Sequence, residues 1–170
     1  NPDAQIMAIS VLQSDGSGDV ATIVKGIDYA YANGADVMSM SLGNYRHSIA
    51  QERALAKAYS RCVIVAAAGN NCLNIEYNCA YCGALPQPSF PAAYTFVIGV
   101  MAGDAFGGFS NYDVHPVLSS YSDEKLYNYE VSAPGVQILS TYPRGRYKQM
   151  SGTSMACPLI AGAVSRLIQC

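Results

Sequence analysis

The sequence has no run of basic residues and no long apolar stretch. Its 170 residues include 10 Lys and Arg against 12 Asp and Glu, which gives a net charge of −2. Because binding to phosphates draws on concentrated positive charge, no nucleic-acid partner is expected. No stretch reaches the roughly eighteen consecutive apolar residues that cross a bilayer, and the first residues do not form a basic-then-apolar signal. We therefore expect no membrane partner either.

The sequence also lacks a set of metal ligands at a recognisable spacing. Its six cysteines include a single C-x-x-C, Cys79 to Cys82, with no second ligand pair and no nearby histidine, which argues against zinc. No metal site is predicted, and a local disulfide among Cys72, Cys79 and Cys82 is the alternative. Cys62 and Cys157 fit small buried residues. The cysteine count favours an oxidising compartment, and hence an extracellular or secreted protein.

With 51% hydrophobic residues, the chain can bury one sizeable core, and we expect one domain or a large part of one. Short apolar runs bounded by turn residues alternate with segments of helical period, which predicts an α/β fold with a parallel sheet. Ligands of such folds gather at the carboxyl ends of the strands. The expected strands are 6–11, 37–41, 63–68, 94–100 and 136–140, the expected helices are 20–32 and 49–60, and 103–130 is expected to be a long loop.

The segment Gly152-Thr153-Ser154-Met155-Ala156-Cys157-Pro158 points to a serine nucleophile. Gly152 permits a sharp bend, and Ser154 then falls at the start of a helix. Pro158 is expected in the first helical turn, where its missing N–H has no partner to lose. The free N–H groups and the positive end of the helix dipole would stabilise an oxyanion that forms beside Ser154.

A serine hydroxyl needs a neighbouring base, usually a histidine held by a carboxylate. The chain has only two histidines. His47 lies in a polar loop and His115 in a stretch rich in Tyr and Ser, and neither has the glycine-rich helical context that aims a base at a serine. We interpret both as surface residues, with His115 as a replacement base the minor alternative. The catalytic machinery within the chain is therefore expected to be incomplete.

Five motifs, in this order and spacing, resemble those of the subtilisin-like serine peptidases (subtilases). The resemblance covers nearly the whole chain and implies a three-layer α/β/α fold with a mainly parallel sheet. Residues 1–170 would form the C-terminal part of a single catalytic domain. The motifs are Met40-Ser41-Leu42-Gly43, Ala66-Ala67-Ala68-Gly69-Asn70, Phe109-Ser110-Asn111-Tyr112, Ala133-Pro134-Gly135 and Gly152-Thr153-Ser154-Met155-Ala156.

The resemblance implies a role for each of several residues. Ser154 would be the nucleophile, and the Asn70 amide would donate to the oxyanion together with the Ser154 N–H. Without the resemblance, Asn70 fits a turn residue after Gly69. An extended peptide would pair with two short segments, although their glycines also fit ordinary turns. The implied substrate-binding residues are Gly16, Ser17 and Gly18 on one side, Ser41, Leu42 and Gly43 on the other, and Ala67, Ala68 and Gly69 in the pocket before the scissile bond.

The resemblance also implies what is missing. In subtilases the catalytic aspartate and histidine precede the serine, but Asp3, Asp15, Asp19 and Asp36 do not match the aspartate motif. The N-terminal part of the catalytic domain, which carries both motifs, would be absent from this chain. Without it, the chain is expected to be inactive. Its sheet would then be covered by that segment or by another copy of the chain. No cofactor is evident; the resemblance makes calcium possible, because it is common in the family, but no ligand set in the chain matches and the metal is left open.

The expected function is therefore that of a serine endopeptidase, which cleaves peptide bonds through an acyl-enzyme, reduced to its serine-bearing fragment. Its partner would be a peptide or protein substrate, and the small apolar walls of the pocket favour an apolar or a broad preference. The alternative is a catalytically silent module that keeps the subtilase fold to bind peptides.

Overall fold

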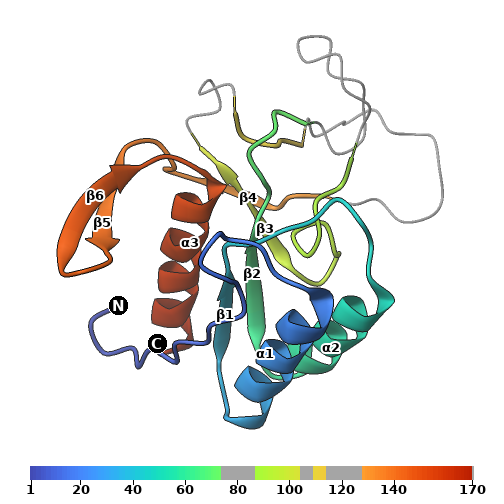
Figure 1. Cartoon of the computed structure of the whole chain (residues 1–170). Coiled ribbons are helices and arrows are strands. Elements are labelled where there is room, and N and C mark those ends of the chain that lie inside the picture. The colour runs from blue at the N-terminus through green and yellow to red at the C-terminus, as the bar shows by residue number, and fades with distance from the viewer. Residues whose placement is uncertain (74–86, 104–108, 114–127, 170) are drawn as a thin grey trace.

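Helices and strands alternate through the first hundred residues of the chain. The computed structural model describes residues 1–73, 87–103, 109–113 and 128–169 (Figure 1). The elements in chain order are α1 Val20–Ala32, β1 Val37–Met40, α2 Ile49–Tyr59, β2 Val63–Ala67, β3 Ile98–Ala102, β4 Val131–Ala133, β5 Ile138–Tyr142, β6 Arg146–Met150 and α3 Thr153–Ile168. In this part of the chain, no helix combines the length and apolarity needed to cross a membrane.

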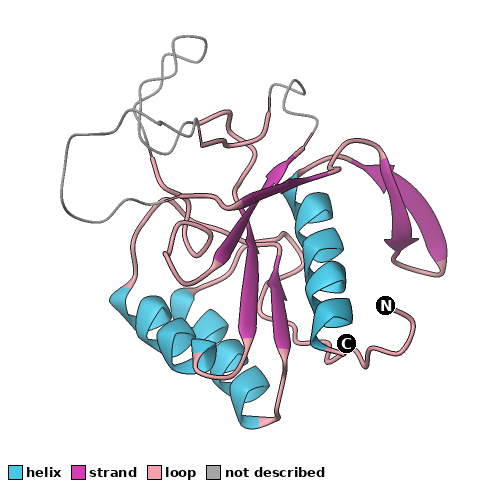
Figure 2. Cartoon of the chain, turned by 180° about the vertical axis from the view of Figure 1, so that it is seen from behind, coloured by secondary structure: helices cyan, strands magenta, loops and turns pink. Residues whose placement is uncertain are grey.

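The first four strands form one parallel sheet in the order β1-β2-β3-β4. Val37 pairs with Val63, Val65 with Ile98 and Val100 with Val131, so the carboxyl ends of all four strands lie at one edge. Helices α1 and α2 cover one face of this sheet, and α3 packs across the other (Figures 1 and 2). The predicted three-layer α/β/α arrangement is confirmed.

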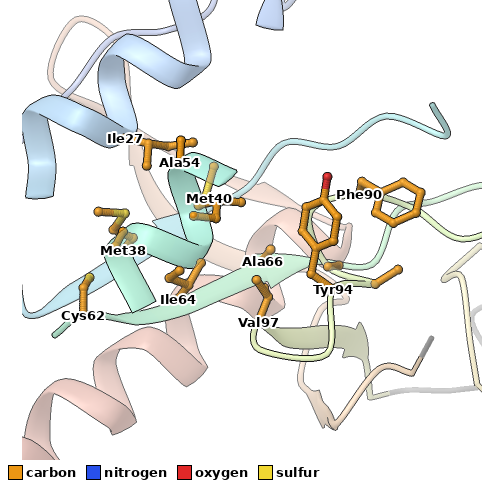
Figure 3. Packing of buried hydrophobic residues seen from close by; sticks show 14 of the residues in the cluster. Ile27, Met38, Met40, Ala54, Cys62, Ile64, Ala66, Phe90, Tyr94 and Val97 are labelled. Atoms are coloured by element: carbon orange, nitrogen blue, oxygen red, sulfur yellow. The ribbon is translucent and has the colours of Figure 1, made fainter. Parts of the chain in front are cut away.

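Alternation along β2 produces the two halves of the core. Ile64 and Ala66 face α1 and α2 and belong to a large apolar cluster that also contains Phe90 and Tyr94 (Figure 3). Val65 and Ala67 face α3 and pack with Ala156, Cys157 and Ala161. A strand buried on both sides must be apolar at every position, which explains its continuous apolar run.

Side-chain hydrogen bonds mark the first turns of α1 and α2. The carboxylate of Asp19 accepts a hydrogen bond from Thr22 N at 2.9 Å and caps α1. The hydroxyl of Ser48 accepts one from Gln51 N at 3.3 Å and caps α2. After α1 the chain turns through Gly34, whose φ of +78° favours glycine.

Residues 6–11 form no strand, although their apolar sequence predicts one. Ile6 is 86% exposed, and no strand of the described chain pairs with this segment. Apolar character favours a strand, but a ladder also needs a neighbour whose backbone groups are in register.

Two further boundaries differ from the prediction. The strand expected at 94–100 begins only at Ile98, because Tyr94 N bonds to Pro91 O and Val97 N to Tyr94 O in consecutive turns. The strand expected at 136–140 is β5, which pairs antiparallel with β6 in a separate hairpin rather than joining the main sheet. Strand β4 was not predicted; it follows the segment expected as a loop at 103–130 and contributes only three residues.

The outer edge of β1 is unpaired within the described residues. A groove beside it is lined by residues from 1–12, α1, β1 and α3. Exposed apolar side chains lie there, including Ile6, Met7 and Leu12. An open strand edge flanked by apolar surface is a template for pairing with another chain.

We expect this chain by itself to self-associate, because association covers the edge of β1 and its apolar neighbours. The Ile6→Lys variant should associate less, since a charge at the edge opposes pairing. Sedimentation velocity over a concentration series measures both. A monodisperse monomer that unfolds cooperatively at moderate concentration would contradict the expectation.

Glu130 joins β4 to β3 through its side chain. Its carboxylate accepts a hydrogen bond from the Gly99 N–H at 2.5 Å. Desolvation of the carboxylate raises the pKa of Glu130 to about 7 although that hydrogen bond opposes the rise, and the neighbouring Asp113 carboxylate adds to it. The side chain itself remains partly exposed, so the effect on stability is moderated by solvent.

The Glu130→Gln variant should alter how stability depends on pH. Between about 4.5 and about 7, folded Glu130 holds a proton that the unfolded chain has released, so this group lowers the free energy of unfolding as pH rises through that window. Relative to the parent protein, the variant should therefore gain stability between pH 4 and pH 8. Urea titrations of both proteins at the two pH values measure the free energy of unfolding. If the variant differs from the parent by the same amount at both pH values, the raised pKa of Glu130 is refuted.

Candidate active site

Ser154 lies in the first turn of α3, where a sharp bend joins β6 to the helix. Gly152 has a φ of +155° and occupies the N-cap position. Its N–H donates to Gly135 O at 2.8 Å, and its carbonyl accepts from Met155 N at 3.0 Å. The bend is thus tied to the end of β4, and Ser154 is partly exposed at the helix N-terminus.

Pro158 lies one turn deeper than the sequence suggested. It is the sixth residue of α3, so it removes the hydrogen bond that a helix would otherwise send to the carbonyl of Ser154. The expectation of a first-turn proline was wrong, because the helix begins at Thr153 immediately after the bend. This carbonyl finds its hydrogen-bond donor just after β1, because Ser41 Oγ donates to Ser154 O at 2.9 Å.

Asn70 follows β2 and is held by the start of α3. Its Oδ1 accepts from Thr153 N at 2.8 Å and from Thr153 Oγ1 at 3.1 Å. Thr153 Oγ1 accepts in turn from Gly69 N at 3.1 Å. These contacts assign the orientation of the amide, and within the described residues Asn70 Nδ2 has no hydrogen-bond partner. The amide therefore has a donor free beside the serine-bearing turn.

These groups line a cleft at the carboxyl ends of β1 and β2, where ligands of parallel α/β sheets bind. No charged side chain contributes to its lining among the described residues. The cleft is lined by Ser41, Leu42, Gly43, Tyr45, Ala67, Gly69, Asn70, Asn71, Ser89, Thr153 and Ser154.

The structure brings most of the expected site residues together. Ser154, Asn70 and the segments Ser41–Gly43 and Ala67–Gly69 converge here, except that Ala68 is fully buried behind the lining. Gly16, Ser17 and Gly18 lie in the turn before α1 and do not line the cleft. Tyr45, Asn71 and Thr153 were not singled out from the sequence. Thr153 could have been identified from the sequence by its position between Gly152 and Ser154 in the bend.

Neither histidine acts on Ser154 in the described part of the chain. His47 Nε2 lies 2.8 Å from Glu52 Oε2, and its ring contacts the edges of Phe90 and Tyr94. Its exposed position agrees with the interpretation as a surface residue. His115 lies outside the described residues. Among the residues that are described, no hydrogen bond reaches Ser154 Oγ, and no three His, Cys, Asp or Glu side chains cluster to hold a metal ion.

Cys157 lies beneath the nucleophile as a buried thiol. Its Sγ lies 3.6 Å from Val65 O, and burial raises the pKa of the thiol. Burial also raises the pKa of Cys62 to about 11. Both are unpaired, as is Cys72. Cys79 and Cys82, the other members of the expected local disulfide, lie outside the described residues.

The sequence model of the subtilase family matches residues 1–170. The chain belongs to the subtilase family. Relatives include Subtilisin DY from Bacillus licheniformis, with 40% identity over 98% of this chain and 55% of the relative. Subtilisin NAT from Bacillus subtilis subsp. natto is 36% identical over 98% of this chain and 39% of its own length. This subtilase chain therefore spans only about half, or less, of these relatives.

A solved structure supports the same fold. The prenylagaramide maturation protease PagA matches with a TM-score of 0.72 and 23% identity, over 92% of this chain and 52% of that protein. At this identity the likeness concerns the subtilase fold alone.

We expect the cysteines of this subtilase chain to differ in reactivity. In the folded protein at pH 8, N-ethylmaleimide should modify partly exposed Cys72 before buried Cys62 and Cys157, because burial blocks access and favours the thiol over the thiolate. Peptide mapping after timed quenching distinguishes the sites, and denatured protein serves as the control. Modification of Cys157 as fast as Cys72 in the folded state would show that the packing between α3 and the sheet opens to solvent.

Proposed function

We propose that this chain is the serine-bearing part of a serine endopeptidase, with Ser154 as nucleophile and Asn70 as oxyanion donor. The observation that carries the proposal is the pairing of Asn70 Oδ1 with Thr153, which leaves Asn70 Nδ2 without a partner among the described residues, next to the residue that precedes Ser154 in the chain. A donor held in advance at the site of developing charge stabilises a tetrahedral intermediate without reorganisation.

The proposed chemistry proceeds in two steps. A base takes the proton of Ser154 Oγ as the oxygen attacks the peptide carbonyl, and the resulting oxyanion accepts from Asn70 Nδ2 and the Ser154 N–H. The base then protonates the leaving amine, and the acyl-enzyme forms. Water, deprotonated by the same base, releases the acyl group and restores the Ser154 hydroxyl.

We propose that an extended peptide lies along the cleft. Ser41–Gly43 would supply backbone for strand addition on one side, with Gly16–Gly18 as the proposed second side of the complete protein. Ala67 and Gly69 give the pocket small apolar walls, while Tyr45 and Asn71 place polar atoms at its rim. The absence of charge in the described lining favours a neutral side chain before the scissile bond.

The base and its aspartate would come from a segment that pairs with the open edge of β1. This placement is supported by the groove beside β1, α1 and α3, which reaches Ser41 and Leu42 at the cleft. A second copy of the chain is the other occupant that we consider for this edge. The proposed setting is extracellular, in keeping with the cysteine content.

The second candidate function is a module that binds peptides without cleaving them. It is favoured by one observation: among the described residues, no histidine or carboxylate contacts Ser154 Oγ, and His47 is committed to Glu52. The two functions differ in whether a base reaches the serine.

Labelling with a fluorophosphonate probe tests the proposal, on the full-length protein and with any co-purifying chain retained. We expect modification of Ser154, located by peptide mapping, and none in Ser154→Ala. The Asn70→Ala variant should retain substrate binding but lose about a hundred- to a thousand-fold in kcat, a magnitude taken over from subtilisin, in which it was measured. Absence of labelling in a folded full-length protein would favour the binding module.

A further inference from the structure

The segment Phe109-Ser110-Asn111-Tyr112 belongs to the motifs of the sequence but has no part in the site described so far. Asn111 is fully buried, with 0% of its surface exposed. A buried amide must find hydrogen-bond partners to offset its lost hydration. The identity of those partners indicates what Asn111 does.

The Asn111 side chain holds the loop after β2 on both sides of Asn70. Its Oδ1 accepts from Asn71 N and from Leu73 N, each at 3.0 Å. Its Nδ2 donates to Ala68 O at 2.8 Å. Oδ1 thus binds the chain after Asn70, and Nδ2 binds the chain before it.

Two further contacts complete this clamp. The backbone N–H of Asn111 donates to Gly69 O at 2.8 Å, and Nδ2 also donates to Tyr45 Oη at 3.1 Å. Tyr45 Oη in turn donates to Asn71 Oδ1 at 2.6 Å across the rim of the cleft. Every backbone segment next to Asn70 is therefore bound to Asn111, directly or through one hydroxyl.

Gly69 is the residue that permits this close approach. It has a φ of +104°, and a Cβ at this position would lie 2.5 Å from Asn111 Nδ2. The glycine before Asn70 thus meets both a conformational and a steric requirement. The loop and the amide that clamps it are matched in shape as well as in hydrogen bonding.

We propose that Asn111 is a positioning residue that fixes the Asn70 amide for oxyanion stabilisation. Asn70 is held by Thr153 at its side chain and by Asn111 at its flanking backbone, so loss of Asn111 would let the loop carry Nδ2 away from its working position. A shift of about 1 Å in such a group can lower a rate by about a hundred-fold. The proposal rests on the proposed function, since it assigns Asn70 the donor role.

Only an amide suits this position. Asp cannot donate to Ala68 O and Tyr45 Oη when ionised, and an apolar residue of similar volume would leave the part-buried Asn71 N–H and the buried Leu73 N–H unpaired. The same arrangement would be found if Asn111 served stability alone. A double-mutant cycle separates the two roles, because only a positioning residue acts through Asn70.

The first test compares Asn111→Ala, Asn70→Ala and the double variant in the full-length protein, with kcat and KM measured on a peptide ester. We expect Asn111→Ala to lower kcat by about ten- to a hundred-fold with less than about a three-fold change in KM. Once Asn70 is removed, adding Asn111→Ala should change kcat by less than about two-fold. Equal losses in both backgrounds would overturn the proposal.

Two further variants keep the test decisive if Asn111→Ala weakens or prevents folding. Gln51→Ala removes another buried polar side chain, on α2 and away from the cleft, and should leave kcat unchanged. If Asn111→Ala does not fold, Tyr45→Phe removes one acceptor of Asn111 Nδ2, and its loss of kcat should likewise vanish in the Asn70→Ala background. A loss of kcat that persists there would overturn the proposal in the same way.

Hydrogen exchange tests the clamp independently of activity. In the full-length protein with its active serine replaced by alanine, we expect Asn111→Ala to speed exchange of the Asn71, Leu73 and Thr153 amides, and Gln51→Ala to leave them protected. Unchanged Thr153 exchange would refute the proposal even if the protein cleaves peptides. Faster exchange, in a protein whose parent form with Ser154 intact is not labelled by fluorophosphonate, would support the clamp and refute only the proposed function.

Discussion

The site depends on a reciprocal hydrogen-bonded pair between the loop after β2 and the first residue of α3. Gly69 N donates to Thr153 Oγ1, while Thr153 N and Oγ1 donate to Asn70 Oδ1. The two segments lie more than eighty positions apart in sequence, and each satisfies backbone groups that the other would leave unpaired. Because of this pair, the oxyanion donor and the nucleophile cannot shift independently. The sheet supplies the rigidity, since α3 packs across its four strands.

Much of this arrangement could be predicted from the sequence, for physical reasons that differ by element. Helices α1 and α2 have apolar faces at helical spacing with Asp19 and Ser48 in capping positions, and β1 and β2 are apolar runs closed by turns. Ser154 and Asn70 stand in motifs whose order implied the family. The contacts of Asn111 could not be predicted, because they join backbone groups from separate loops and no spacing encodes them.

The errors in the strands share one cause, which is that neighbours decide strand formation. Residues 6–11 have the composition of a buried strand, but no strand in the described part of the chain pairs with them. Strand β6 is exposed along its whole length and mainly polar, so no apolar alternation indicates it, yet it pairs with β5 through a tight turn at positive φ. Pro158 was assigned to the first turn because the start of α3 depends on the bend at Gly152, whose exact position sequence alone does not fix.

Pro158 has a further effect on the environment of Ser154. Because Pro158 removes one helical N–H, the carbonyl of Ser154 is free to accept a hydrogen bond from the Ser41 hydroxyl, which directly follows β1. A helix without a proline here would keep that carbonyl within its own ladder of hydrogen bonds and leave the Ser41 hydroxyl without this partner. The proline thus exchanges one local hydrogen bond for a contact between residues 113 positions apart, so the placement of the nucleophile depends on the end of β1 as well as on its own helix.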